Sequence, residues 1–200
     1  MEKINTIEEL RSFKARLLPE IGEKMRSHTV VYKGRVLDFT TDEVTLPNGA
    51  AAPREVVRHK GAVCVLPLTE EGNVICVFQH RYPFDEILCE IPAGKLDPGE
   101  EPLHAAVREL EEETGAAAEK IRFIGLYYPS PAILDEKIYM YLAEGLTFRE
   151  QHLDADEFLF VKEIPLSLLC DMIASGEIRD GKTQAAVLKT RYILEKEEDR

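Results

Sequence analysis

Residues 93–116 read Ala-Gly-Lys-Leu-Asp-Pro-Gly-Glu-Glu-Pro-Leu-His-Ala-Ala-Val-Arg-Glu-Leu-Glu-Glu-Glu-Thr-Gly-Ala, and this stretch decides the fold. It begins with a Gly/Pro turn over residues 94–99 and continues as a helix-forming run to Gly115. Pro102 suits a first helical turn, where its missing N–H costs no hydrogen bond, and Gly115 suits a C-terminal stop. The segment therefore predicts a loop joined to a helix that ends at Gly115.

The predicted helix has an apolar face and an acidic face. A 3.6-residue period groups four apolar residues, which we expect to pack on a core: Leu103, Ala106, Val107 and Leu110. Glu109, Glu112 and Glu113 share a neighbouring face, where like charges repel one another. Such a face is often simply solvated, but a hard divalent cation would turn the repulsion into attraction.

The full pattern favours the metal-binding interpretation, because it resembles the Nudix box, Gly-x5-Glu-x7-Arg-Glu-apolar-x-Glu-Glu-x-Gly-apolar. The matching positions are Gly94, Glu100, Arg108, Glu109, Leu110, Glu112, Glu113, Gly115 and Ala116. Every defined position is filled, so the chain is identified as resembling the Nudix hydrolase family.

Composition restricts the classes of partner. The chain has 200 residues, 44% of them hydrophobic, and a formal net charge of −12, which argues against nucleic acid as the main partner. No stretch approaches the roughly 20 apolar residues of a membrane span, and we find no apolar signal segment. The four cysteines are scattered without metal-binding spacing. These features predict a soluble cytoplasmic protein.

The remaining pattern alternates strands with a few helices. We expect helices at 6–18, ended or kinked by Pro19, and at 167–175 and 183–194. Strands are expected at 28–32, 35–40, 43–46, 54–59, 61–68, 74–79, 87–91, 121–128, 138–143 and 158–164. This predicts an α/β or α+β fold, and the resemblance implies a Nudix-like α/β/α sandwich with a mixed central sheet. Residues 1–58 would form a helix and a small antiparallel sheet for dimerisation and nucleotide binding, ahead of a hydrolase domain at 59–200.

The resemblance implies hydrolysis of a nucleoside diphosphate linked to another group. Carboxylates with Mg²⁺, or with Mn²⁺ as the alternative, can polarise a phosphoryl oxygen and activate water. By family pattern, Glu109 and Glu113 are the first metal ligands, with Glu112 next and the Ala93 carbonyl completing the set. Glu112 and Arg108 are also counted with the catalytic group, with Arg108 and Glu100 expected to orient the loop and helix.

Segments outside the box resemble the bacterial ADP-ribose pyrophosphatase branch. They are 79–83, 90–94, 128–131 and 176–183, and Pro131 lies sixteen residues after Gly115, as in that branch. The resemblance implies that the substrate is ADP-ribose, split to AMP and ribose 5-phosphate. A nucleotide sugar or another adenine dinucleotide is the alternative substrate, and a sensor that binds ADP-ribose without cleaving it is a further alternative.

Four residues are candidates for binding that substrate. Arg81 and Arg54 suit the diphosphate, because a guanidinium offers paired donors to phosphate oxygens, although either could be an ordinary surface arginine. Tyr32 could stack on a base or pack in a core, and Pro131 marks the branch-specific loop.

The resemblance also implies a general base and a second subunit. Similar enzymes carry a catalytic glutamate on the loop before the last strand, and in segment 153–158 Glu157 matches best, although a solvated loop acid is the simpler interpretation. The branch further implies a homodimer whose N-terminal sheet is exchanged with the partner and completes the nucleotide site.

Overall fold

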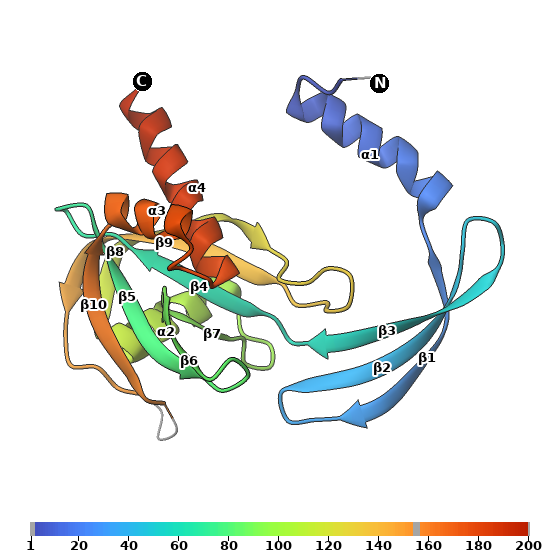
Figure 1. Cartoon of the computed structure of the whole chain (residues 1–200), viewed down its shortest axis with the longest axis horizontal. Coiled ribbons are helices and arrows are strands. Elements are labelled where there is room, and N and C mark those ends of the chain that lie inside the picture. Colours follow the sequence, from blue (N-terminus) through green and yellow to red (C-terminus); the bar gives the residue numbers. More distant parts are fainter. Residues whose placement is uncertain (1–2, 154–156, 200) are drawn as a thin grey trace. The chain divides into compact units, whose positions relative to one another are not determined.

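A computed structural model describes residues 3–153 and 157–199 of the chain (Figure 1). The structure divides into two compact units: Met1–His59 with Ala132–Asp135, and Lys60–Pro131 with Glu136–Arg200. Each unit has its own sheet system, so each is described by itself.

Two sheets form the second unit. The four-stranded sheet has the order β7-β4-β9-β8, made of β4 (Ala62–Pro67), β7 (Ala93–Lys95), β8 (Ala116–Tyr127) and β9 (Ile138–Phe148). Its β4–β9 pair is parallel and its other pairs are antiparallel, so this sheet is mixed. The three-stranded antiparallel sheet has the order β10-β5-β6, made of β5 (Asn73–Arg81), β6 (Glu86–Glu90) and β10 (Leu159–Pro165).

Strand β4 is buried on both faces, which explains its nearly continuous apolar sequence. Val63 and Val65 point to one face and join the core beneath helix α2 (Pro102–Thr114). Cys64 and Leu66 point to the other face, where the core includes residues of α3 (Leu166–Ser175) and α4 (Gly181–Glu198). Helices therefore cover both faces of the mixed sheet, and the predicted α/β/α sandwich is confirmed.

Helix α2 begins and ends where the sequence predicts. Pro102 occupies the first turn, and Gly115 caps the C-terminus in the left-handed region at φ 69° while its N–H donates to the Glu111 carbonyl. A Cβ on Gly115 would lie 2.4 Å from the carbonyl oxygen of Arg149, so both the backbone angle and the space require glycine.

The predicted buried face of α2 is partly wrong. Ala106 and Leu110 are buried, but Leu103 and Val107 are 45% and 38% exposed. The buried stripe is rotated toward Ala105, Ala106, Glu109, Leu110, Glu113 and Thr114. The helical period gives the angles between these side chains around the helix axis. It does not give the rotation of the helix about that axis, and here Glu109 and Glu113 face inward.

The first unit consists of helix α1 (Ile7–Ile21) and the antiparallel sheet β1 (Lys24–Lys33), β2 (Leu37–Thr45) and β3 (Ala51–His59). Two predictions here are wrong in detail. Helix α1 continues through Pro19 to Ile21, so Pro19 does not end it, and a kink at Pro19 stays a prediction. The predicted strands 35–40 and 43–46 form the single strand β2, because its ladder to β3 is unbroken. In the described part of α1 and β1, every residue of β1 is exposed and no residue of α1 is buried.

Within the residues that the structure describes, no helix has the length and apolar character needed to cross a membrane.

We expect Gly115→Ala to destabilise the protein more than Gly176→Ala. Both glycines end helices with positive φ, which costs an alanine about 1–2 kcal/mol, but nothing lies within 4 Å of a Cβ at Gly176. The clash at Gly115 adds about 1–3 kcal/mol. Urea denaturation of both variants measures the difference, and equal losses would show that the Arg149 carbonyl moves aside without cost.

Candidate active site

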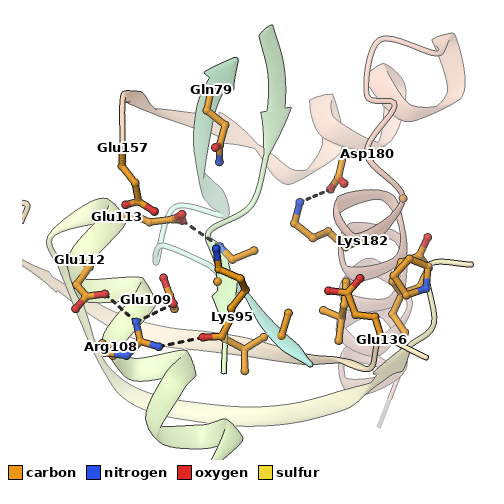
Figure 2. Close-up of a pocket in the computed structure, with 18 of the residues that line it drawn as sticks. Gln79, Lys95, Arg108, Glu109, Glu112, Glu113, Glu136, Glu157, Asp180 and Lys182 are labelled. Carbon is orange, nitrogen blue, oxygen red and sulfur yellow. Dashed lines mark hydrogen bonds and ion pairs between the residues drawn. The ribbon is translucent and has the colours of Figure 1, made fainter. Parts of the chain in front are cut away.

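The second unit contains a cavity of about 540 Å³ at the N-terminal end of the loop that precedes α2. Figure 2 shows two opposed groups of side chains in it. The acidic group is Glu109, Glu112, Glu113 and Glu157, and the facing group includes Asp180 and Lys182. Residues from α2, β5, β7 and the start of α4 thus meet in one cavity.

Arg108 ties the loop to the helix. Its Nε and Nη2 donate to the two carboxylate oxygens of Glu100, each at 3.0 Å, and Nη2 also donates to the Lys95 carbonyl at 3.2 Å. Its Nη1 donates to Glu109 at 2.7 Å and to Glu112 at 3.0 Å. Glu100 and the other acids raise the pKa of Arg108, and Arg108 lowers the pKa of Glu100. These contacts join the loop to the helix, and the orienting role of Arg108 and Glu100 stays a prediction.

Glu113 is buried with little positive charge to compensate it. Only 2% of the residue is exposed, and its Oε2 accepts a hydrogen bond from the Ala93 N–H at 3.0 Å. The pKa of Glu113 is raised to about 8, chiefly by burial; Glu109 and Glu157 also raise it, while the Ala93 N–H and Lys182 lower it. Burial likewise raises the pKa of Glu109, with Glu112 and Glu157 adding to the effect.

These donors fit a divalent cation. Carboxylate oxygens are hard ligands, and a cation beside Glu109 and Glu113 would supply the positive charge that their burial calls for. In the part of the chain that the structure describes, no three acid, histidine or cysteine side chains are already gathered about one point. Glu109 is held by Arg108 and Glu113 by the Ala93 N–H, so metal binding would draw them together.

Gly94 makes room for the Glu109 carboxylate. A Cβ on Gly94 would lie 1.9 Å from the carboxyl carbon of Glu109, well inside contact distance. Any side chain at this position would push Glu109 away from the cavity. The glycine that opens the loop is therefore required by the close approach of an acid, because its φ is not in the positive region.

Comparison with known proteins identifies the family. A NUDIX domain model matches residues 58–186, which is more than half of the chain. The chain belongs to the NUDIX family. The resemblance predicted from residues 94–116 is thus confirmed.

Relatives within the NUDIX family share most of their length with this chain. The ADP-ribose pyrophosphatase of Bacillus subtilis (strain 168) is 44% identical over 172 residues, which cover 85% of this chain and 93% of that protein. The methanol dehydrogenase activator of Bacillus methanolicus is 42% identical over 167 residues, covering 82% and 90%. A solved structure of an ADP compounds hydrolase has a TM-score of 0.77, covers 88% of this chain and 95% of its own, and is 20% identical. That last similarity supports the NUDIX fold alone.

Most of the predicted NUDIX site residues line the cavity. The set comprises Arg81, Ala93, Arg108, Glu109, Glu112, Glu113 and Glu157. Residues 154–156, just before Glu157, lie outside the described residues. NUDIX hydrolases generally use divalent metal ions, and the assignment of individual ligands, including the Ala93 carbonyl, stays a prediction.

Three predicted substrate-binding residues are not brought to this cavity by the second unit. Pro131 is exposed and is not a lining residue, whereas Pro129 is. Arg54 belongs to the first unit, where it pairs with Glu23, and Tyr32 is 62% exposed there, so the alternative that Tyr32 packs in a core is wrong. The substrate-binding roles of Arg54, Tyr32 and Pro131 remain predictions.

Sequence reasoning missed several residues that line the cavity. They include Gln79, Tyr127, Glu136, Asp180 and Lys182. Asp180 and Lys182 lie in segment 176–183, which carried the family resemblance but received no role in the site. The signal available in the sequence was the presence of Asp180 and Lys182 just before a predicted helix, in a segment that also carries the family resemblance.

We expect the metal-free protein to lose stability between pH 5 and pH 8 because of Glu113. In the folded state its pKa is about 8, above the ordinary value of 4.5, so the fold keeps a proton that the unfolded chain releases. That stabilisation is complete below pH 4.5 and disappears as the pH rises through 8. Guanidinium denaturation with a chelator present should show wild type losing a few kcal/mol relative to Glu113→Gln over this range. Glu111→Gln, at an exposed position of the same helix, should follow wild type, and a Glu113→Gln curve parallel to wild type would contradict the expectation.

Proposed function

We propose that this chain hydrolyses the diphosphate bridge of ADP-ribose to AMP and ribose 5-phosphate, with Mg²⁺ as its metal. The observation that carries the proposal is that the buried acids Glu109 and Glu113 share one cavity with the cationic side chains of Arg81 and Lys182. The names of two relatives support the substrate: the 44% identical protein of Bacillus subtilis and the 34% identical protein of Mycobacterium tuberculosis are both ADP-ribose pyrophosphatases.

The residues divide the work between holding charge and moving a proton. Glu109 and Glu113, with Glu112 beside them, would hold the metal, which when bound supplies charge neutralisation at the phosphates and a more acidic water. Arg108 fixes Glu109 and Glu112 in place. Arg81 faces the same cavity and would donate to a phosphate oxygen.

Water attack on a phosphorus atom breaks one phosphoanhydride bond and leaves two phosphomonoesters. The attacking water must lose a proton, and Glu157 would accept it. Glu157 lines the cavity and is close enough to Glu109 and Glu113 to raise the pKa of both.

An enzyme for a nucleotide sugar is the second candidate. The GDP-mannose pyrophosphatase of Salmonella typhimurium is 33% identical over 174 residues, which cover 78% of this chain. A sensor that binds without cleaving is less well supported, because every glutamate of the box is present.

The deciding experiment measures products from ADP-ribose, GDP-mannose and NADH with Mg²⁺ by chromatography. We expect the highest kcat/KM for ADP-ribose and no turnover with a chelator. Glu109→Gln should lower kcat at least about 100-fold, because it removes a metal ligand. Glu111→Gln changes an exposed acid of the same helix and should retain wild-type turnover. A higher kcat/KM for GDP-mannose would favour the second candidate, and ADP-ribose binding without turnover would favour the sensor.

Glu157→Gln tests the proposed base. Loss of a general base typically costs 10²- to 10⁴-fold, so kcat should fall by about 100-fold or more. Glu150→Gln, at an exposed position on the preceding segment, is the control. Unchanged kcat in Glu157→Gln would remove this residue from the mechanism.

The proposal includes a homodimer in which residues 1–58 serve dimerisation and nucleotide binding. Strand β1 is an edge strand of its sheet and has no buried residue, while Met25, Val30 and Val31 are 49–66% exposed. A second copy would cover such a strand and its unpaired edge.

A cytoplasmic location also belongs to the proposal, since all four cysteines are free thiols, as expected in a reducing compartment.

Light scattering after size exclusion should give twice the 22.7 kDa of one chain. Val31→Asp places a charge on the exposed strand and should shift the protein toward monomer. A monomer at micromolar concentration for wild type would defeat the exchanged-sheet proposal.

A further inference from the structure

A buried ion network lies behind Arg81. Glu90, at the end of β6, is 1% exposed, and its two carboxylate oxygens accept from Arg81 Nε and Nη2, each at 2.6 Å. The same carboxylate accepts from Lys182 Nζ. Burial acts to raise the pKa of Glu90, but Arg81 and Lys182 outweigh it and keep the pKa below its ordinary value.

Lys182 lies at the start of α4, where this helix is hydrogen-bonded to residues 90–91. Its side chain is only 11% exposed, and Nζ also contacts Asp180 Oδ2 at 3.1 Å. The next residue, Thr183, is fully buried and accepts from the Ile91 N–H at 3.0 Å. Consecutive residues of α4 thus hold the consecutive residues Glu90 and Ile91, which lead directly into the metal loop.

This arrangement leaves one edge of the Arg81 guanidinium for a ligand. Glu90 engages Nε and Nη2, and among residues 3–153 and 157–199 no hydrogen bond from Nη1 is found. Arg81 lines the cavity, as Lys182 does. A guanidinium clamped along one edge loses little rotamer freedom when the other edge meets an oxyanion.

We propose that Lys182 is a positioning residue for diphosphate binding: through Glu90 it holds Arg81 with Nη1 facing the cavity. The inference deepens the proposed function, since it concerns the same cavity. Removing Lys182 would leave Glu90 with a single cationic partner, and the carboxylate and the guanidinium would then shift together. The alternative is that Lys182 contacts the phosphate itself, in which case it would act independently of Arg81.

A double-mutant cycle separates the two. The variants are Lys182→Met, Arg81→Met and their combination, and the measurement is the Kd of ADP with Mg²⁺ by titration calorimetry. We expect each single variant to weaken ADP binding about tenfold and the double variant to bind no more weakly than Arg81→Met. Lys182→Arg should restore most of the affinity. Lys189→Met, at an exposed position of the same helix, should leave it unchanged.

Turnover of ADP-ribose by the same variants gives the second readout. Lys182→Met should raise KM about tenfold and change kcat less than about threefold, because it affects binding through Arg81. If Lys182→Met does not fold, judged by thermal denaturation, Lys182→Gln replaces it in the cycle with the same expected non-additivity. Additive losses, or an unchanged Kd, overturn the inference. Absence of ADP-ribose turnover in wild type overturns the proposed function alone, because ADP binding still reports on Lys182 and Arg81.

Discussion

The burial of two carboxylates on one helix is the constraint on which the site depends. Glu109 and Glu113 turn toward the sheet, so α2 packs with Ala105 and Ala106 inward and leaves Leu103 and Val107 to solvent. Such burial is costly for an ionised acid, and the structure meets part of the cost with Arg108 and the Ala93 N–H. The negative charge that these partners leave unbalanced would attract a metal cation. The buried face of the helix and the glycine that opens its loop both follow from this one arrangement of charge.

On the opposite wall of the cavity, buried acids are balanced by cationic side chains of the protein. Arg81 and Lys182 face Glu90 and Asp180, so two cations balance two acids within hydrogen-bond distance. A balanced buried network is rigid, because moving one member would leave the charge of another buried without a partner. The cavity therefore has one wall whose buried acids lack sufficient counter-charge and one wall whose cations are already paired with acids. A bridging diphosphate, with anionic oxygens on both phosphates, suits this asymmetry.

Local sequence was sufficient for the loop and helix and insufficient for the second wall. Pro102, Gly115 and the spacing of the glutamates predicted the bounds of α2, because caps and periodicity are local properties. Lys182 meets Glu90 across 92 positions, and no local pattern contains that contact. The face that α2 buries was also mispredicted, since hydrophobicity alone could not anticipate acids that turn inward. In the first unit, β2 is continuous because its pairing with β3 overrides the polar residues in its middle.

The contact between Lys182 and Glu90 has a consequence for biosynthesis. Ribosomes synthesise chains from the N-terminus onward, so Glu90 leaves the exit tunnel before Lys182, which contacts it. Until α4 emerges, the nascent domain carries an acid destined for the interior with one of its cations missing. The buried ion network around Glu90 therefore cannot be complete until the residues of α4 have been synthesised.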